Sequence, residues 1–131
     1  MAWTAAVCGR LKSDYRYSNT IVYNNYPFPT SVSQQHVDAI AAAAQLIIDE
    51  RIAEEKRCEA LNSKASLAAM YAPGAMPSGL LAAHKALDKV VDKAFGYKGA
   101  DDDASRVAFL FKLYEQATSL LQPVSAHKGG R

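Results

Sequence analysis

In this sequence of 131 residues, the residues best suited to recognise another molecule form the charged run Lys12-Ser13-Asp14-Tyr15-Arg16. Side chains alternate between the two faces of an extended chain, so Lys12, Asp14 and Arg16 are expected to project on one face. In a DNA groove, Lys or Arg pairs with guanine O6 and N7, and Asp accepts from cytosine N4. A Lys/Asp couple could therefore read both halves of a G·C pair. The alternative is a solvated, self-compensating rim of charges.

Other candidate sites have weaker support in the sequence. His84 lies on an apolar helical stripe without a cluster of Cys or His, so we expect a structural histidine. The run Asp101-Asp102-Asp103 lacks the alternation of an EF-hand loop, so we expect it to begin a helix. In Asn25-Tyr26-Pro27-Phe28, Tyr replaces a Pro of the amino-methyltransferase motif, and no Gly-rich cofactor unit precedes it. We therefore expect that the chain itself is not an enzyme, binds no cofactor and holds no metal.

The residues before position 30 are expected to form a short helix and an arm. Apolar residues at helical spacing predict the helix over residues 3–13. The β-branched and aromatic run Ile21-Val22-Tyr23, followed by Pro27 and Pro29, predicts an extended aromatic arm. The first helix begins without a capping residue, which fits a domain cut from a longer protein and leaves a natural start as the alternative.

Three longer helices are predicted after the arm. The first follows candidate N-caps at residues 30–33 and ends near Leu61. The second runs from Pro77-Ser78 to Gly96, a natural C′ residue, after a short helical turn over residues 66–71. The last follows the aspartate run and meets Pro123. The expected core combines residues of all three helices: Ile40, Ile47, Ile48, Leu80, Leu87, Val91, Leu110, Phe111 and Tyr114.

The predicted fold class is mainly α, a small helical bundle of three main helices plus the short N-terminal helix and the extended aromatic arm. Residues 1–29 would form the arm region, 30–122 a helical domain and 123–131 a loose tail. Half of the residues are hydrophobic and 21% are charged, which is typical of a soluble globular domain. No apolar run approaches the roughly 20 residues of a membrane span, and no secretory signal is visible, so we expect a cytoplasmic protein without membrane contact.

The formal net charge of +2 lies entirely within residues 10–29, where Arg10, Lys12 and Arg16 oppose Asp14. A free-standing DNA-binding module usually has a stronger basic stripe. If the chain contacts DNA, we therefore expect it to do so as part of a larger protein.

The run Gly9–Pro29 (GRLKSDYRYSNTIVYNNYPFP) resembles a pattern near the C-terminus of the large MmeI-like DNA methyltransferases. The resemblance continues through Met76-Pro77, Leu80–Leu87 (LLAAHKAL), Asp88–Tyr97 (DKVVDKAFGY) and Asp103–Glu115 (DASRVAFLFKLYE). It implies a piece of an adenine-N6 methyltransferase that uses S-adenosylmethionine and serves restriction–modification or phage defence. The catalytic and cofactor-binding motifs would lie upstream of this piece.

The resemblance also implies roles for single residues. Lys12, Asp14 and Arg16 fall on positions that read bases, within the closing piece of the target-recognition domain. The helices after Pro29 would form a C-terminal domain that packs beside the recognition domain and helps to embrace double-stranded DNA. Residues expected to fasten the recognition segment to the helices are Tyr17, Ile21, Tyr23, Tyr26, Pro27 and Phe28. Asn24 and Asn25 are expected to bond to backbone at the turn.

A second hypothesis remains open on the sequence alone. The chain could be an α-helical interaction module that docks other domains or dimerises, with no direct DNA contact. In that case the charges between Arg10 and Arg16 are incidental.

Overall fold

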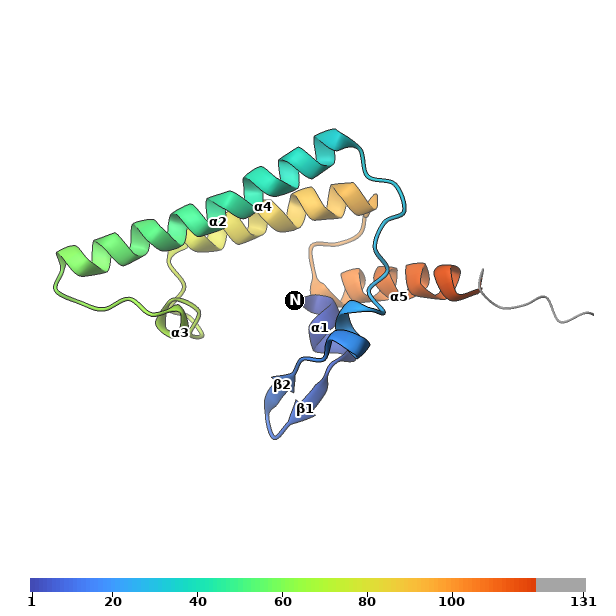
Figure 1. Cartoon of the computed structure of the whole chain (residues 1–131), viewed down its shortest axis with the longest axis horizontal. Helices are drawn as coiled ribbons and strands as arrows, with labels where there is room; N and C mark the ends of the chain where they lie inside the picture. The colour runs from blue at the N-terminus through green and yellow to red at the C-terminus, as the bar shows by residue number, and fades with distance from the viewer. Residues whose placement is uncertain (120–131) are drawn as a thin grey trace, which may run out of the picture. The chain divides into compact units, whose positions relative to one another are not determined.

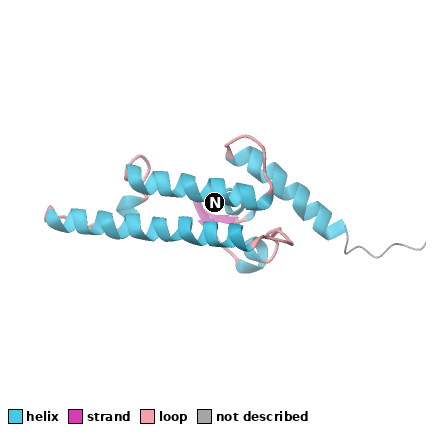
Figure 2. Ribbon diagram, turned by 90° about the horizontal axis from the view of Figure 1, so that it is seen from above, coloured by secondary structure: helices cyan, strands magenta, loops and turns pink. Residues whose placement is uncertain are grey.

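The computed structural model describes residues 1–119 of the chain, and these are mainly helical (Figures 1 and 2). The mainly α fold class is therefore confirmed. The described residues divide into two compact units, one formed by residues 1–28 with residues 99–119 and the other by Pro29–Lys98. The predicted loose tail 123–131 and the approach of the last helix to Pro123 lie outside the described residues.

The Pro29–Lys98 unit is built on two long helices, α2 (Gln34–Ala60) and α4 (Ser78–Phe95). They run antiparallel and lie side by side in both views, with the short helix α3 (Leu67–Met70) between them in the chain (Figures 1 and 2). The buried core cluster consists of Ile47, Met70, Leu80 and Ala83. Burial of the Ile47, Met70 and Leu80 side chains contributes about 1.5–3 kcal/mol each, which holds α3 against the helix pair.

Local capping explains where the long helices of this unit begin and end. The Ser33 side chain accepts from the backbone N–H of His36 at the start of α2. At its end Asn62 adopts a positive φ of 53°, and the N–H groups of Asn62 and Ser63 donate to the carbonyls of Glu59 and Cys58. Gly96 ends α4 with a φ of 69°, as predicted from the sequence.

The other unit contains α1 (Ala2–Val7), a hairpin of β1 (Gly9–Leu11) and β2 (Asp14–Arg16), the π-helix η1 (Asn19–Tyr23) and α5 (Asp103–Ser119). Trp3 on α1 is its buried centre, with only 5% of its surface exposed. The Trp3 ring lies 5.2 Å from the Phe111 ring and 6.3 Å from the Tyr114 ring, both on α5. Aromatic contacts at these distances join α1 to α5.

An aspartate begins α5, as predicted. The two carboxylate oxygens of Asp102 accept from the backbone N–H and the hydroxyl of Ser105. These hydrogen bonds, the backbone one foremost, lower the pKa of Asp102 below its ordinary value. Because the folded pKa is lowered, this stabilisation of α5 is present above the unfolded pKa and is lost as pH falls through the folded pKa.

Three sequence predictions are wrong in detail. The first helix ends at Val7 instead of near Ser13, because the chain turns into the hairpin there. The arm is not extended over Asn19–Tyr23 but forms η1, which buries Val22. The single core over all three helices is also wrong, since Leu110, Phe111 and Tyr114 belong to the unit of Trp3 and not to that of Leu80.

No helix among residues 1–119 is long and apolar enough to cross a membrane.

The adjacent residues Leu80 and Leu81 provide a matched test of the α2–α4 core. Leu80 is fully buried, whereas 43% of Leu81 is exposed. Leu80→Ala is expected to lower the free energy of unfolding by about 2–5 kcal/mol, and Leu81→Ala by less than about 1 kcal/mol. Urea unfolding followed by far-ultraviolet circular dichroism measures both, and equal losses would contradict this packing.

Candidate nucleic-acid interface

The hairpin of β1 and β2 carries the charged run singled out in the sequence. The strands pair antiparallel, with Arg10 opposite Tyr15 and Leu11 opposite Asp14, and the two-residue loop is Lys12-Ser13. All residues from Gly9 to Tyr17 are exposed. A two-stranded ribbon of this kind is narrow enough to enter the major groove of DNA, which is about 12 Å wide.

The structure places two of the three predicted site residues as expected. Asp14 and Arg16 are two positions apart in β2, so they lie on one face of the ribbon, about 6.6 Å apart along the strand. The expectation that Lys12 continues this extended face is wrong, since Lys12 occupies the loop with a positive φ of 58°. Lys12 therefore presents its ammonium at the tip of the hairpin.

The opposite face of the ribbon carries a contact that the sequence analysis missed. The Arg10 guanidinium carbon lies 4.5 Å from the centre of the Tyr15 ring. Such a cation–π contact at an exposed site contributes about 0.5–1 kcal/mol, and here it joins the two strands. Arg10 and Tyr15 face each other only when Lys12-Ser13 is taken as a two-residue loop between two strands. A prediction of this hairpin would therefore have found the contact.

The base of the hairpin is anchored by Trp3. Its indole N–H donates to the carbonyl of Val22 at 2.9 Å, a bond that joins α1 before the hairpin to η1 after it. The Trp3 ring also meets the Tyr26 ring edge-on at 5.9 Å. Both ends of the segment that carries the charged run are thus held in place by one buried side chain.

The aromatic arm after the hairpin is only partly buried. Asn25 donates to the carbonyls of Thr20 and Ile21, which confirms its expected bond to backbone. Tyr26 is half-buried and Pro27 is buried. The other residues expected to fasten the arm are about half exposed in this chain, namely Tyr17, Ile21, Tyr23 and Phe28.

His84 has a structural partner in the Pro29–Lys98 unit. Its Nε2 atom lies 2.8 Å from the Tyr71 hydroxyl, which also accepts from Nε and Nη2 of Arg51. Because Arg51 only donates, the Tyr71 O–H is left to donate to His84. The prediction of a satisfied structural histidine is confirmed.

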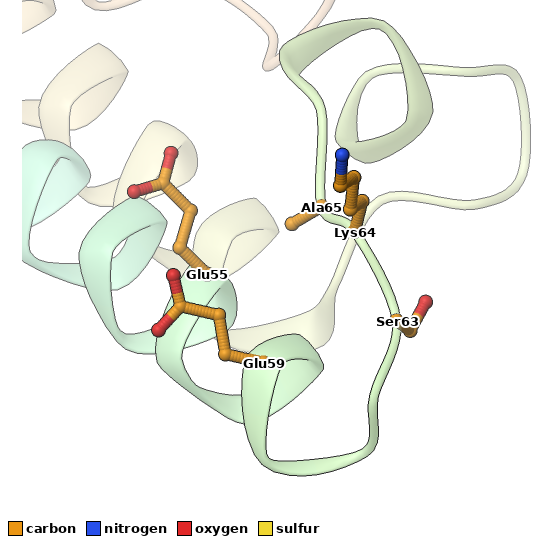
Figure 3. Close-up of a pocket in the computed structure, with 5 residues that line it drawn as sticks. All are labelled: Glu55, Glu59, Ser63, Lys64 and Ala65. Atoms are coloured by element: carbon orange, nitrogen blue, oxygen red, sulfur yellow. The ribbon is translucent and has the colours of Figure 1, made fainter.

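A small cavity lies at the end of α2, with a volume of about 170 Å³. Figure 3 shows the carboxylates of Glu55 and Glu59 on successive turns of α2 and Lys64 on the loop that follows. Ligand sites usually enclose about 300–1,000 Å³. Among residues 1–119, no group of three or more His, Cys, Asp or Glu is placed to hold a metal ion.

Comparisons with known proteins divide the chain near residue 30. Residues 1–30 match the family described as the MmeI target recognition domain, and residues 32–122 match the MmeI C-terminal domain. The chain is 39% identical over 118 residues to DNA methyltransferase A of Bacillus subtilis (strain 168), which covers 90% of this chain and 12% of that protein. A solved structure of the type IIL restriction–modification enzyme MmeI in complex with DNA is 40% identical, with a TM-score of 0.76, over 90% of this chain and 15% of that one. The chain thus spans only a small part of the proteins it matches.

The positive φ of Lys12 gives a test of the hairpin itself. Lys12→Gly is expected to stabilise the hairpin by up to about 1 kcal/mol and so to raise its population, because glycine adopts positive φ without a steric cost. Ser13→Gly is the matched control, since Ser13 is not among the residues with positive φ. Cross-strand NMR contacts between Arg10 and Tyr15 report the population, and an equal gain from both variants would refute the turn geometry.

Proposed function

The chain belongs to the MmeI family, and from this premise we propose that it closes the target-recognition domain and forms the C-terminal helical domain of a DNA adenine-N6 methyltransferase. The chain contributes recognition and no chemistry of its own. Its partners are double-stranded DNA and the upstream methyltransferase and recognition domains of the intact enzyme. The enzyme works in the cytoplasm, in a restriction–modification or phage-defence system.

The observation that carries this proposal is the exposed, anchored hairpin. Its three candidate readers, Lys12, Asp14 and Arg16, lie within the residues that match the target recognition domain. None of the three has an ion-pair partner in the described part of the chain. Their charged groups are therefore available to another molecule.

The chemistry of the three side chains suits base recognition. An Arg16 guanidinium presents a planar fork of donors that matches guanine O6 and N7, and an Asp14 carboxylate accepts from cytosine N4. The spacing of about 6.6 Å between them is close to the rise of two base pairs, about 6.8 Å. Lys12 at the tip reaches furthest from the anchored base of the hairpin.

S-adenosylmethionine, the methyl donor of the proposed enzyme, does not fit the described residues. The cavity at Glu55 and Glu59 has a volume of about 170 Å³, which is smaller than the roughly 300–1,000 Å³ of a ligand site. The cofactor is accordingly assigned to the upstream part of the enzyme.

The interaction-module hypothesis also has an observation in its favour. Tyr23 and Phe28 have ring centres 5.5 Å apart and are both more than half exposed. An exposed aromatic pair of this kind is typical of a surface that another domain covers. Docking through this pair uses residues other than the hairpin charges, which that hypothesis leaves incidental.

A charge reversal in the intact enzyme tests the base-reading role. Lys12→Glu with Asp14→Arg leaves the net charge unchanged but inverts the donor and acceptor pattern, so the methylated target sequence is expected to shift by at least one base pair. Each bidentate pair discriminates against a wrong base by about 1–3 kcal/mol, so the shift is readily measured by sequencing methylated DNA.

The matched control is Lys64→Glu with Glu59→Arg, a charge-conserving pair of exposed residues outside the hairpin. It is expected to leave the target unchanged. An active Lys12/Asp14 variant with its original target would sink the assignment of these two residues.

A further inference from the structure

A row of lysines runs along helix α4 in the Pro29–Lys98 unit. Lys85, Lys89 and Lys93 follow one another at four-residue intervals, and all three are exposed. Four residues advance an α-helix by about 6 Å and turn it by about 40° beyond a full turn. The three ammonium groups therefore lie on one face of α4, along about 12 Å of its length.

This face points away from the core. Leu80 and Ala83 belong to α4 and are buried against α2 and α3. At about 100° per residue, these two residues lie on the side of α4 opposite the row. The exposed small residue Ala82 lies at nearly the same angle as Lys89 and precedes Lys85, so the surface at the N-terminal end of the row is low. A rigid neighbour can approach α4 there without displacing large side chains.

The charges of the row are not neutralised within the chain. Within the described residues, the side chains of Lys85, Lys89 and Lys93 form neither an ion pair nor a hydrogen bond. Asp88 and Asp92 lie to one side of the row, which leaves the opposite side, that of Lys93, as the more positive approach.

The neighbouring helix strengthens this polarity. Arg51, Lys56 and Arg57 on α2 are outnumbered by its acidic residues, which are Asp38, Asp49, Glu50, Glu54, Glu55 and Glu59. A polyanion is therefore repelled from α2 and attracted to the outer face of α4.

We propose that Lys85, Lys89 and Lys93 bind the phosphate backbone of duplex DNA without regard to base sequence. This inference rests on the proposed function and names the part of the helical domain that meets DNA. A DNA strand carries one phosphate for about every 3.4 Å of helix axis, so a row of about 12 Å passes three or four phosphates. Lysine is a compact charge on a flexible stem and suits phosphate contact better than base reading.

A salt titration with the 131-residue chain tests the row. The affinity for a short duplex of mixed sequence is measured by fluorescence anisotropy between about 50 and about 200 mM salt, where each neutralised phosphate contributes about 0.9 to the slope of log K against log salt. Replacing all three lysines of the row by Gln is expected to make that slope shallower by about 2.7.

The control variant replaces Lys56, Lys64 and Lys112 by Gln, three exposed lysines outside the row. Both variants lower the formal net charge by three, from +2 to −1, so any general electrostatic effect is common to them. Gln keeps a good helix propensity, and circular dichroism verifies that both variants fold.

The row is supported if the slope and affinity fall in the row variant and persist in the control. Equal losses in both variants, no loss in either, or no binding by the unaltered chain at the lowest salt overturn it. Salt-dependent self-association that only the row variant loses, seen by sedimentation, also overturns it, because the row then meets the acidic α2 of a second copy. Failure of the row leaves the target sequence set by Lys12 and Asp14 untouched, so the two proposals fail separately.

Discussion

The hydrogen bond from the Trp3 indole to the carbonyl of Val22 is the contact on which the candidate interface depends. The two bonded residues are 19 positions apart in the sequence, and the hairpin lies between them. Short isolated hairpins are marginal in water, and this one has no buried residue of its own. Because Trp3 holds both ends of the segment, its burial already restricts the chain, and this lowers the further loss of conformational entropy when the hairpin forms.

The same side chain links the two family domains that the chain contains. Trp3 lies in the stretch that matches the target recognition domain, whereas Phe111 lies in the stretch that matches the C-terminal domain. Helix α5 therefore packs on the recognition segment, although its sequence belongs with α2 and α4. In the proposed enzyme, the last helix of the C-terminal domain is thus a support for the base of the reading hairpin. Under the proposed function, we expect a defect at Phe111 to reach the hairpin through its contact with Trp3.

Local rules were sufficient to predict the long helices from the sequence. Gly96 and the N-cap Ser33 act through hydrogen bonds to near neighbours, so their effects are visible in short windows. The π-helix at Asn19–Tyr23 was not predictable in this way, because the burial of Val22 and the hydrogen bond from Trp3 to its carbonyl override the strand preference of its β-branched residues.

The positions of the candidate site residues were predicted only in part, because only some of them follow a local pattern. Asp14 and Arg16 follow strand alternation, which sequence shows directly. Lys12 departs from it because a two-residue loop demands a positive φ, and Lys-Ser lacks the Asn-Gly or Asp-Gly signal that marks such a loop. The packing of α5 against α1 joins residues about a hundred positions apart, and no local pattern indicates it.

The most direct test of the account is a cross-link from the tip of the hairpin to DNA. In the intact enzyme, with Cys8 and Cys58 replaced by Ser, Ser13→Cys places a thiol beside Lys12, and duplexes carry a thiol tether on one base at a time. The account predicts disulfide cross-links to bases inside the target sequence from position 13, and none from a Ser63→Cys control after α2. Cross-links from position 13 that ignore the target sequence, or that fall only outside it, would contradict the proposed reading role of the hairpin.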